Sequence, residues 1–556
     1  MHISLFCSLI VTSTLHLTAF ALWPKPRSLI TGSFAIRLSS DFYISAVFPS
    51  VPQDLNSAIS RTQSFLQNDK LGRLVVGRGS SDASAVRAAP ELNSLALILS
   101  SNGFDAPDSI IKESQKSLKE RDESYSLTVP LGSSQATLRA NTTLGLFRGL
   151  TTFSQLWYDY EGDTYTLVAP IKIEDSPAFP YRGFMLDTAR NFFPVSDVKR
   201  TLDAMSWAKI NTFHWHVTDS QSFPLQVPGF LELSQAGAYS NNSVYSLDDV
   251  QDIVSYAGER GIDVLMEIDT PGHSSIIAAS HPEHIACFEE SPWSTFAGEP
   301  PAGQLRLASS STTNFTASLL AAAASVLPSS MFSTGGDEIN TNCYADDTQT
   351  QAELNATGRT LEQALNVFTQ ATHGALRQLG KAPVVWEEMV LEHNVTLGND
   401  TVVMIWISSQ DAAAVAAKGF QIVQSPSDYF YLDCGGGGWL GDDVLGNSSC
   451  DPFKSWQKAY SFDPFNNLTI EQRSLVLGGQ QLLWAEQSGP ENLDSIAWPR
   501  AAASAEVFWT GGTLNGTEAL PRLHAHRFRM VNRGVRAIPL QPEWCALRPD
   551  ACDATS

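Results

Sequence analysis

The chain has 556 residues, of which 43% are hydrophobic and 17% are charged, and its formal net charge is −22 at pH 7. This length allows a sizeable core in two or more domains, and the apolar content excludes an intrinsically disordered chain. The negative charge repels phosphate backbones and anionic membranes, so neither nucleic acid nor a membrane surface is expected as a partner.

The N-terminus has the pattern of a secretory leader. An apolar run is followed by Ala19-Phe20-Ala21, a small-residue cleavage pattern, and then by a Pro-rich stretch that begins at Trp23. We therefore expect residues 1–21 to be a signal peptide and the mature chain to begin near Leu22. No Lys or Arg precedes the apolar run, so an uncleaved anchor is the alternative. No other stretch approaches the roughly 20 apolar residues that span a bilayer.

Glycosylation sequons and an even number of cysteines agree with secretion. Nine N-x-S/T sequons occur, at Asn141, Asn241, Asn314, Asn355, Asn394, Asn399, Asn447, Asn467 and Asn515. Beyond Cys7 in the leader, six cysteines remain, at Cys287, Cys343, Cys434, Cys450, Cys545 and Cys552. Six cysteines allow 15 pairings, of which we expect the nearest in sequence: 287–343, 434–450 and 545–552. No C-x-x-C occurs, so neither a zinc ribbon nor a redox dithiol is indicated.

Residues 22–172 predict a small α+β domain in which no chemistry is visible. Strand-like runs occur at 74–76, 95–99 and 125–129, and a helix is predicted from Leu144 to Tyr158. A joint with two prolines, residues 173–180, follows this domain.

After the joint, the pattern predicts a (β/α)₈ barrel within a second domain, residues 173–556. Eight short apolar runs recur, at 183–187, 212–217, 263–269, 331–335, 383–386, 401–406, 421–424 and 477–484. Helical segments separate most of the runs, including 196–209, with Ser196 as a candidate N-cap, and 361–379. Strands that alternate with helices form a parallel sheet, and eight such units close a barrel.

Catalytic residues of such a barrel lie at the carboxyl ends of its strands. The predicted strand ends carry carboxylates, one arginine, one histidine, one tyrosine and three tryptophans, which we expect on one face: Asp187, Arg190, Asp219, Glu267, Asp269, His273, Asp337, Glu338, Trp386, Glu387, Trp406, Tyr431, Asp433, Trp484 and Glu486.

The dipeptide Asp337-Glu338 is the sharpest of these signals. Adjacent side chains of a strand point to opposite faces, so both reach one site only where the strand is turning, as Gly335 and Gly336 allow. Two nearby carboxylates resist joint ionisation, so one of them keeps the proton that a glycosidic oxygen would need. An acidic loop or a helix cap is the alternative.

His273 follows a Pro-Gly turn and is expected to hydrogen-bond Glu338, with Asp219 behind it. A histidine that only satisfies local backbone groups is the alternative. His214 and His216 alternate on a strand, and we expect at most one of them in the barrel interior.

No cofactor is expected, and no metal. His281 and His284, in the sequence His-Pro-Glu-His, do not match the H-E-x-x-H zinc motif. The Gly-rich stretch after Cys434 has no P-loop context, and no G-x-S-x-G occurs, so a phosphate cradle and an α/β-hydrolase are not supported.

Three tryptophans, Trp386, Trp406 and Trp484, are predicted at strand ends, where flat apolar walls suit a sugar ring or an acetamido methyl. Core packing is the alternative for each of them. Arg190 and Glu486 are candidate partners for sugar hydroxyls, and a mutual or surface ion pair is the alternative there.

These residues resemble glycoside hydrolase family 20, the β-N-acetylhexosaminidases, and most closely its secreted fungal members. The resemblance rests on five stretches and covers essentially 181–545: Arg182 to Arg190, His214 to Asp219, Asp269 to His273, Gly335 to Glu338, and Trp484 to Glu486. Trp498-Pro499-Arg500-Ala501 also looks like the family, and residues 22–172 look like its small accessory domain. Family members often have Ser before the arginine and Asp after Asp219, where this chain has Ala189 and Ser220.

The resemblance implies substrate-assisted hydrolysis with retention of configuration, an exception to the scheme with two catalytic carboxylates. Glu338 would protonate the leaving oxygen, and the 2-acetamido carbonyl of the sugar would attack the anomeric carbon. Asp337 would orient and stabilise the acetamido group, Tyr431 would hydrogen-bond its oxygen, and Asp219 with His273 would form a relay to Glu338.

The remaining implied roles concern binding of the sugar. The tryptophans would wall the acetamido pocket, and three polar side chains would hold hydroxyls: Arg190 the 3- and 4-hydroxyls, Glu486 the 4-hydroxyl and Asp433 the 6-hydroxyl. Expected substrates are neutral β-linked N-acetylhexosamine oligosaccharides, either chitooligosaccharides or N-glycans.

Two functional alternatives remain open. One is a non-catalytic sugar-binding protein on the same barrel, and the other is a retaining glycosidase with Glu486 as covalent nucleophile. Family members often dimerise, so a homodimer is one expectation, and the leader predicts a secreted enzyme or one of a vacuolar or lysosome-like compartment.

Overall fold

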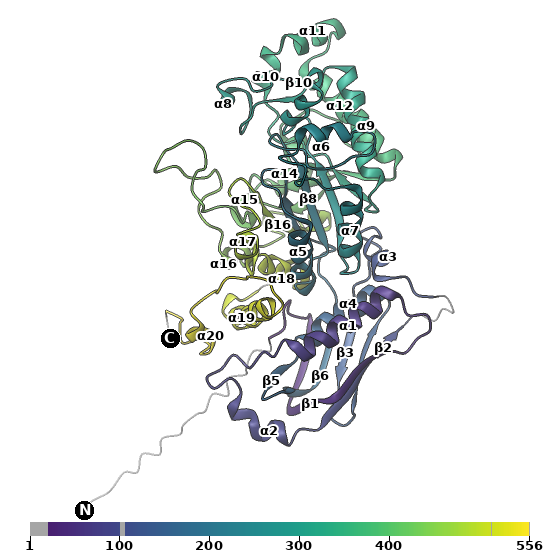
Figure 1. Cartoon of the computed structure of the whole chain (residues 1–556), viewed down its shortest axis with the longest axis vertical. Helices are drawn as coiled ribbons and strands as arrows, with labels where there is room; N and C mark the ends of the chain where they lie inside the picture. Colours follow the sequence, from purple (N-terminus) through teal and green to yellow (C-terminus); the bar gives the residue numbers. More distant parts are fainter. Residues whose placement is uncertain (1–20, 101–105, 513, 555–556) are drawn as a thin grey trace, which may run out of the picture.

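The computed structural model describes residues 21–100, 106–512 and 514–554. The predicted leader lies outside this part of the chain except for Ala21. None of the described helices is long and apolar enough to cross a membrane. Figure 1 shows a sheet with helices across it in the lower part of the molecule and the barrel above it.

The N-terminal domain is a six-stranded sheet with the order β1-β2-β4-β3-β6-β5. Its strands are β1 (Ser28–Ala46), β2 (Glu91–Leu99), β3 (Tyr125–Val129), β4 (Gln135–Ala140), β5 (Tyr158–Tyr160) and β6 (Asp163–Asp175). Helices α1 (Gln53–Asn68) and α4 (Thr143–Ser154) lie across one face of the sheet (Figure 1). The shorter helices are η1 (Ser80–Asp82), α2 (Ala83–Arg87) and α3 (Ile110–Ser114). Apolar side chains between the sheet and the helices form a separate core.

The predicted strands 95–99 and 125–129 lie in β2 and β3, but the strand predicted at 74–76 is wrong. That stretch forms turns, in which the amide of Val75 donates to the carbonyl of Arg73, and Gly77 and Gly79 follow at positive φ. The predicted helix 144–158 ends at Ser154, and Tyr158 begins β5. An apolar run cannot by itself distinguish the end of a buried helix from a following strand.

The second domain is a closed barrel of eight parallel strands, as the alternating runs predicted. The strands are β7 (Tyr181–Asp187), β8 (Thr212–Thr218), β9 (Asp263–Ile268), β12 (Met331–Ser333), β13 (Ala382–Trp386), β14 (Val402–Ile405), β15 (Gln421–Gln424) and β16 (Val476–Leu483). Nearly every residue of these strands is buried, because side chains fill the inside of the barrel and helices cover the outside. A small hairpin, β10 (Ile285–Ala286) with β11 (Gln304–Leu305), lies in the insertion after β9.

Helices and turns connect the barrel strands and extend beyond them. They are α5 (Val195–Trp207), α6 (Leu231–Gly237), α7 (Leu247–Gly258), η2 (Ser275–Ala279), η3 (Pro282–His284), α8 (Trp293–Phe296), α9 (Ser310–Ser325), α10 (Thr341–Asp346), α11 (Thr348–Thr357), α12 (Leu361–Gln378), α13 (Glu388–Leu391), α14 (Ala412–Ala417), α15 (Ser427–Phe430), α16 (Trp456–Tyr460), η4 (Gln472–Leu475), α17 (Leu493–Ala497), α18 (Arg500–Thr510), α19 (Gly516–Asn532) and α20 (Glu543–Ala546).

Two of these helices test predicted boundaries. In α5 the N-cap is Pro194 and not Ser196, which lies in the first turn. In α12 the structure agrees with the expected 361–379 to within one residue, and Thr360 forms a capping box with Gln363.

The two domains meet through buried charges at the base of the barrel, which we call the base network. Glu123 of the N-terminal domain accepts hydrogen bonds of 2.6 Å from both Arg148 and Arg182, the latter on β7. Lys209, before β8, donates to Asp175 at 3.0 Å. All five side chains are almost fully buried and opposite charges are adjacent, so the contact fixes the orientation of the domains.

Three disulfides join the cysteines nearest in sequence, Cys287–Cys343, Cys434–Cys450 and Cys545–Cys552. All nine sequon asparagines are exposed, so their occupancy stays a prediction compatible with the fold.

Candidate active site

A cavity of about 370 Å³ opens at the carboxyl ends of the barrel strands, a size that suits one sugar residue. Ten of the predicted site residues line it: Arg190, His273, Asp337, Glu338, Trp386, Trp406, Tyr431, Asp433, Trp484 and Glu486. Asp219, by contrast, is fully buried behind the cavity wall. The strand ends therefore converge on one site as expected for a barrel.

The end of β12 turns sharply and brings both carboxylates of Asp337-Glu338 to the cavity. Gly335 and Gly336 adopt φ of 65° and 99°, and Glu338 itself has φ of 50°. A Cβ on Gly335 would lie 1.8 Å from Oδ1 of Asp269, so no other residue fits there. Asp337 is buried, whereas the Glu338 side chain is 38% exposed.

Asp337 is a buried acceptor with an unused oxygen. Its Oδ1 has no hydrogen-bond partner among the described residues, and its pKa is raised by burial and by the charge of Asp269. Burial likewise raises the pKa of Asp269 to about 6, although its Oδ1 accepts from the amide of Gly336 at 2.8 Å. Asp337 thus lies near two other carboxylates, Asp269 and Glu338, and of the two Asp269 raises its pKa more.

Glu338 has a different partner. Its Oε2 lies 3.4 Å from Nε2 of His273, whose Nδ1 lies 3.1 Å from Oδ1 of Asp219. Burial opposes ionisation of Glu338, but the hydrogen bond and charge of His273 outweigh it and lower the pKa of this carboxyl. Burial also opposes protonation of His273, but Asp219 and Asp337 outweigh it and raise the pKa of the imidazole. The expected contact of His273 with Asp219 and Glu338 is therefore present.

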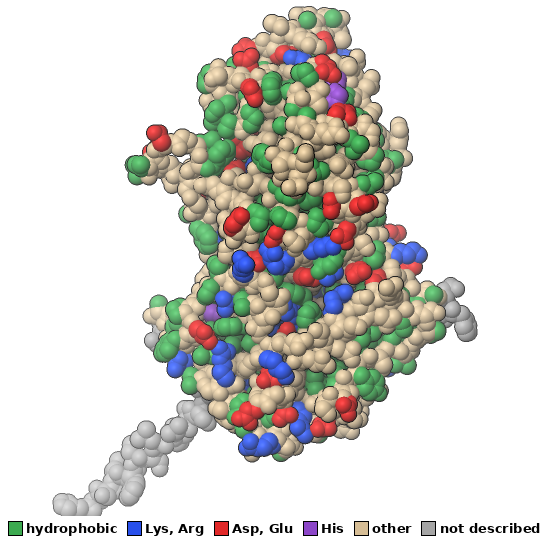
Figure 2. Space-filling model, in the orientation of Figure 1, with side chains coloured by type: hydrophobic (Ala, Val, Ile, Leu, Met, Phe, Trp, Pro, Cys, Tyr) green, Lys and Arg blue, Asp and Glu red, His purple; other side chains and the backbone are tan. Residues whose placement is uncertain are grey.

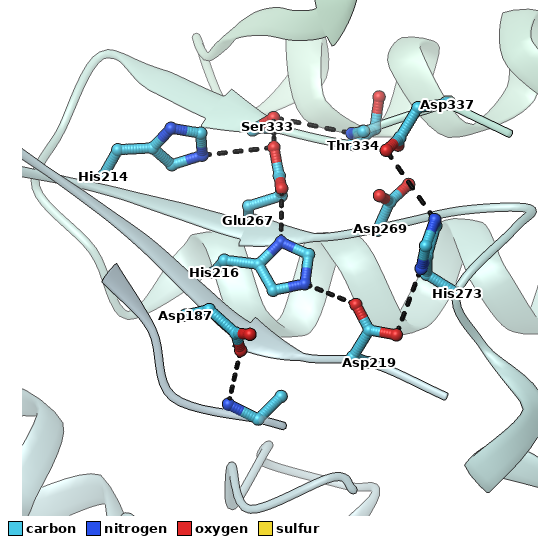
Figure 3. Close-up of polar contacts among 12 residues, drawn as sticks. Asp187, His214, His216, Asp219, Glu267, Asp269, His273, Ser333, Thr334 and Asp337 are labelled. Carbon is cyan, nitrogen blue, oxygen red and sulfur yellow. Dashed lines mark hydrogen bonds and ion pairs between the residues drawn. The ribbon is translucent and has the colours of Figure 1, made fainter. Parts of the chain in front are cut away.

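The relay continues deeper into the barrel than the sequence predicted (Figure 3). Oδ2 of Asp219 lies 2.7 Å from Nε2 of His216, and Nδ1 of His216 lies 2.6 Å from Oε1 of Glu267. The other oxygen of Glu267 lies 3.1 Å from Nε2 of His214. Burial lowers the pKa of His216, but its hydrogen bonds to Asp219 and Glu267 outweigh this and raise it to about 10. His216 is therefore an imidazolium between two carboxylates.

The expectation that at most one of His214 and His216 faces the barrel interior is wrong. Both contact Glu267 inside the barrel, because residues two apart on a strand share a face.

Arg190 is the only cation with a permanent charge among the described residues that line the cavity. Its Nη1 lies 3.0 Å from Asp219 and 3.3 Å from Asp187, and its Nε donates to Glu299 at 2.9 Å. The structure thus gives Arg190 three carboxylate partners, and no pair with Glu486 is among its short contacts.

Glu299 was not predicted from the sequence. It lies between α8 and β11, in a stretch without strand or helix periodicity, and only its place over the cavity reveals it. Gly298 beside it approaches Glu338 so closely that a Cβ would lie 2.2 Å from Oε2.

Aromatic rings form one wall of the cavity. The Trp386 and Trp484 rings lie 6.2 Å apart, and Trp406 stacks with Tyr431 at 6.3 Å and 12°. The indole Nε1 of Trp386 is buried without a partner among the described residues, and Trp406 donates to Glu388 at 2.8 Å. These tryptophans line a cavity and are not simply core residues.

Several carboxyls around the cavity have raised pKa values because burial disfavours their charge. The values are about 9 for Glu387, about 8 for Glu388 and Glu486, and about 7 for Asp433. We call these four the mouth carboxyls. Glu387 was expected at a strand end without an assigned role, and Glu388 was not predicted, since a Glu-Glu pair after a strand carries no distinctive motif.

Comparison with known proteins identifies the family. The model described as "Glycosyl hydrolase family 20, catalytic domain" matches residues 179–512, which is more than half of the chain. The chain belongs to glycosyl hydrolase family 20. A second model, described as "beta-acetyl hexosaminidase like", matches residues 22–156 of the N-terminal domain. The resemblance inferred from the motifs is confirmed, and the chain is a glycoside hydrolase.

Relatives cover both domains. A "Beta-hexosaminidase" of Arthroderma benhamiae is 36% identical over 78% of this chain and 74% of that protein. A "Chitooligosaccharidolytic beta-N-acetylglucosaminidase" of Bombyx mori is also 36% identical, over 78% of this chain and 75% of its own. A "Beta-hexosaminidase subunit beta" of Felis catus is 33% identical over 94% of each chain.

Solved structures share the fold. The chitobiase of Flavobacterium johnsoniae superposes with a TM-score of 0.72 at 24% identity, over 93% of this chain and 73% of that one. A Streptomyces plicatus N-acetyl-beta-hexosaminidase gives 0.69 at 22% identity, over 94% of this chain and 97% of that one.

Proposed function

We propose that this enzyme is an exo-acting β-N-acetylhexosaminidase that releases terminal GlcNAc or GalNAc by substrate-assisted hydrolysis. The observation that carries the proposal is the unpaired Oδ1 of buried Asp337 in a cavity walled by tryptophans, beside the more exposed Glu338. A buried acceptor without a donor is costly, and the N–H of a 2-acetamido group would satisfy it.

The first step breaks the glycosidic bond. Glu338 gives its proton to the leaving oxygen, while the acetamido carbonyl oxygen attacks the anomeric carbon and forms an oxazolinium ion. This nucleophile is tethered to its target carbon, which gives it a high effective concentration. Binding of the sugar removes water from Glu338, and this desolvation raises the pKa of the acid toward the value that proton transfer requires.

The second step returns the enzyme to its starting state. Water attacks the anomeric carbon and opens the oxazolinium ring, and the Glu338 carboxylate takes the proton of that water. The sugar leaves with its original configuration, because two inversions have occurred at the same carbon.

Asp337 stabilises the positive charge that develops between these steps. In this proposal the bound acetamido N–H and the developing positive charge favour the ionised form of Asp337, whose pKa burial and Asp269 otherwise raise. In the same proposal Tyr431 donates to the acetamido oxygen, and three polar side chains hold ring hydroxyls: Arg190, Asp433 and Glu486.

Neutral substrates fit this site. Arg190, the one permanent cation of the described lining, already faces Asp219, Asp187 and Glu299. A 6-sulfated sugar beside Asp433 would find no free partner, so we expect its turnover to be much slower than that of the neutral sugar. We further propose β-linked chitooligosaccharides or N-glycans as natural substrates and secretion through the predicted leader.

Two aryl glycosides that differ only in the 2-acetamido group test the mechanism. Substrate assistance predicts turnover of the acetamido compound alone and strong inhibition by a thiazoline mimic of the intermediate. Comparable turnover of both compounds would favour an enzyme nucleophile such as Glu486, and tight sugar binding without any turnover would favour a non-catalytic binding protein.

Variants of the dipeptide separate its two roles. Glu338→Gln should lower kcat by about 10²–10⁴ with a poor leaving group and far less with an activated one. Asp337→Asn should lower kcat by about 10²–10³ with both, because charge stabilisation is lost at either leaving group. An Asp337→Asn enzyme with normal turnover of the activated substrate contradicts the role given to Asp337.

A further inference from the structure

A histidine-carboxylate cluster lies outside the active site, in the insertion after β9. His281, Glu283 and His284 lie at or next to η3, and Glu232 of α6 and Thr312 of α9 contact the two rings. One ligand atom from each of His281, Glu283 and His284 lies within 4.8 Å of the other two. The spacing of these residues in the sequence matched no metal motif, so only the fold brings the set together.

Two ring nitrogens face one carboxylate oxygen. Nδ1 of His281 lies 3.4 Å from Oε1 of Glu283, and Nε2 of His284 lies 3.9 Å from the same oxygen. The second distance is too long for a direct hydrogen bond. Two ligands of a tetrahedral ion bound at about 2.0 Å are about 3.3 Å apart, which the 3.4 Å distance matches and the 3.9 Å distance exceeds.

The opposite ring nitrogens already have partners outside the cluster. Nε2 of His281 lies 3.2 Å from Oε1 of Glu232, and Nδ1 of His284 lies 3.1 Å from Oγ1 of Thr312. If these outer nitrogens carry the ring protons, the lone pairs of both rings point toward Glu283. A histidine that binds a metal characteristically donates its other N–H to a carboxylate or another polar oxygen, as both rings do here.

Ordinary ion pairing accounts less well for His284. Its side chain is 7% exposed, and its Nε2 lies too far from Glu283 for a hydrogen bond. Where Nδ1 carries the ring proton, the lone pair of Nε2 and the Glu283 carboxylate repel each other unless a cation lies between them. Glu283 is 61% exposed and gives an ion a path from solvent.

We propose that the chain binds one Zn²⁺ through Nδ1 of His281, Oε1 of Glu283 and Nε2 of His284, with water as the fourth ligand. Nitrogen and carboxylate donors in a three-ligand set favour Zn²⁺ over Mg²⁺ and Ca²⁺, which require oxygen ligands. Through the hydrogen bond of His281 to Glu232, the ion would tie η3 to α6 and hold the insertion that begins just after His273. Its effect is therefore on stability and not on the chemical step.

Zinc titration of the chelator-treated full chain tests the proposal. Calorimetry should show one saturable Zn²⁺ site, Co²⁺ should give the intense visible bands of tetrahedral coordination, and Mg²⁺ should give no heat. Saturation with Zn²⁺ should raise Tm, because the ion binds the folded state, and leave kcat unchanged.

Variants assign the site. His281→Asn and Glu283→Gln change partly exposed side chains and should abolish zinc binding, whereas Glu232→Gln should weaken it by about 10–100-fold through the outer contact. His393→Asn is the matched control, since His393 forms a single imidazole–carboxylate pair with Glu362 at 3.2 Å, and it should bind zinc normally. No binding by the wild-type chain, or binding that persists in His281→Asn and Glu283→Gln, overturns the proposal. The second result would place the ion elsewhere, for instance at the Asp219, His273 and Glu299 cluster of the cavity.

Discussion

The two ends of the barrel both bury charge, but they balance it differently. In the base network Glu123 lies between two arginines and Asp175 faces Lys209, so each carboxylate has a cation within 3.0 Å. At the mouth, the four mouth carboxyls have pKa values from about 7 to about 9. Glu387 and Glu388 are buried, and Asp433 and Glu486 are partly exposed. On the face of the molecule that Figure 2 shows, most surface Lys and Arg side chains lie in the lower half, with Asp and Glu among them.

The difference indicates what each end does. A fully paired buried charge holds two domains in one orientation, and removal of one partner is costly. A buried carboxyl without a cation costs stability when it ionises, but it offers an acceptor or a proton to a ligand. Loss of one partner is therefore expected to cost most in the base network, whereas the unpaired Oδ1 of Asp337 and Nε1 of Trp386 at the mouth are open to a substrate.

The largest expected effect is a loss of stability when one charge of the base network is removed. Glu123→Gln leaves Arg148 and Arg182 without a buried counter-charge, so the free energy of unfolding should fall by about 3–5 kcal/mol. Denaturant titration measures the loss, and the specific activity of the folded fraction should stay normal. Glu174→Gln is the control, because its 59% exposed side chain pairs with Lys172 on the surface, and it should change stability little. Equal effects of both substitutions would remove the distinction between the base network and a surface pair.

The next effect concerns how the stability of the folded enzyme depends on pH, and it has opposite signs at the two ends of the barrel. The pKa of Glu388 is raised from 4.5 to about 8, mainly by burial, so its contribution to stability is full below pH 4.5 and is lost as pH rises toward 8. Burial raises the pKa of Glu123, but Arg182 and Arg148 outweigh it and lower it to about 2, so its contribution is present above pH 4.5 and is lost as pH falls toward 2. The unliganded enzyme should therefore lose stability between about pH 5 and pH 8.

Glu388→Gln checks the part of this slope that comes from the mouth. One group that is protonated in the folded state contributes up to about 1.4 kcal/mol per pH unit, so the variant should show a flatter decline of Tm with pH. Glutamine keeps an acceptor for Nε1 of Trp406, which isolates the effect of charge. If Tm falls with pH equally in the variant and the wild type, ionisation of Glu388 does not destabilise the folded state.

The sequence predicted the architecture better than the connections within it. Eight apolar runs identified all eight barrel strands, because a buried parallel strand has a clear signal, and the strand ends then located most of the cavity lining. Glu299 and Glu388 were missed because they lie beyond a strand, in segments whose path depends on tertiary packing. The sequence did not indicate that Asp269 raises the pKa of Asp337 more than Glu338 does, since adjacency in sequence says little about which carboxylates meet across a barrel.

The smallest effect we predict is a loss of activity on substitution of His216, which lies inside the barrel between its two ends. This imidazolium holds Asp219 by one nitrogen and Glu267 by the other, so it acts on Glu338 only through Asp219 and His273. Loss of the contact to Asp219 should loosen His273 and lower kcat about tenfold, which corresponds to about 1.4 kcal/mol. The loss should be greater for a poor leaving group, and the acidic limb of the pH profile should shift.

Two substitutions of His216 each keep one of its two hydrogen bonds, which makes this test specific. The amide nitrogen of His216→Asn can occupy the place of Nδ1 and keep the bond to Glu267, whereas that of His216→Gln can occupy the place of Nε2 and keep the bond to Asp219. If His216 acts through the relay, His216→Gln should retain more activity than His216→Asn, even where both lower Tm equally. If activity instead follows Tm in the two variants, His216 has a purely structural role, like the charges of the base network. Asp219 would then be the deepest residue of the relay that affects catalysis.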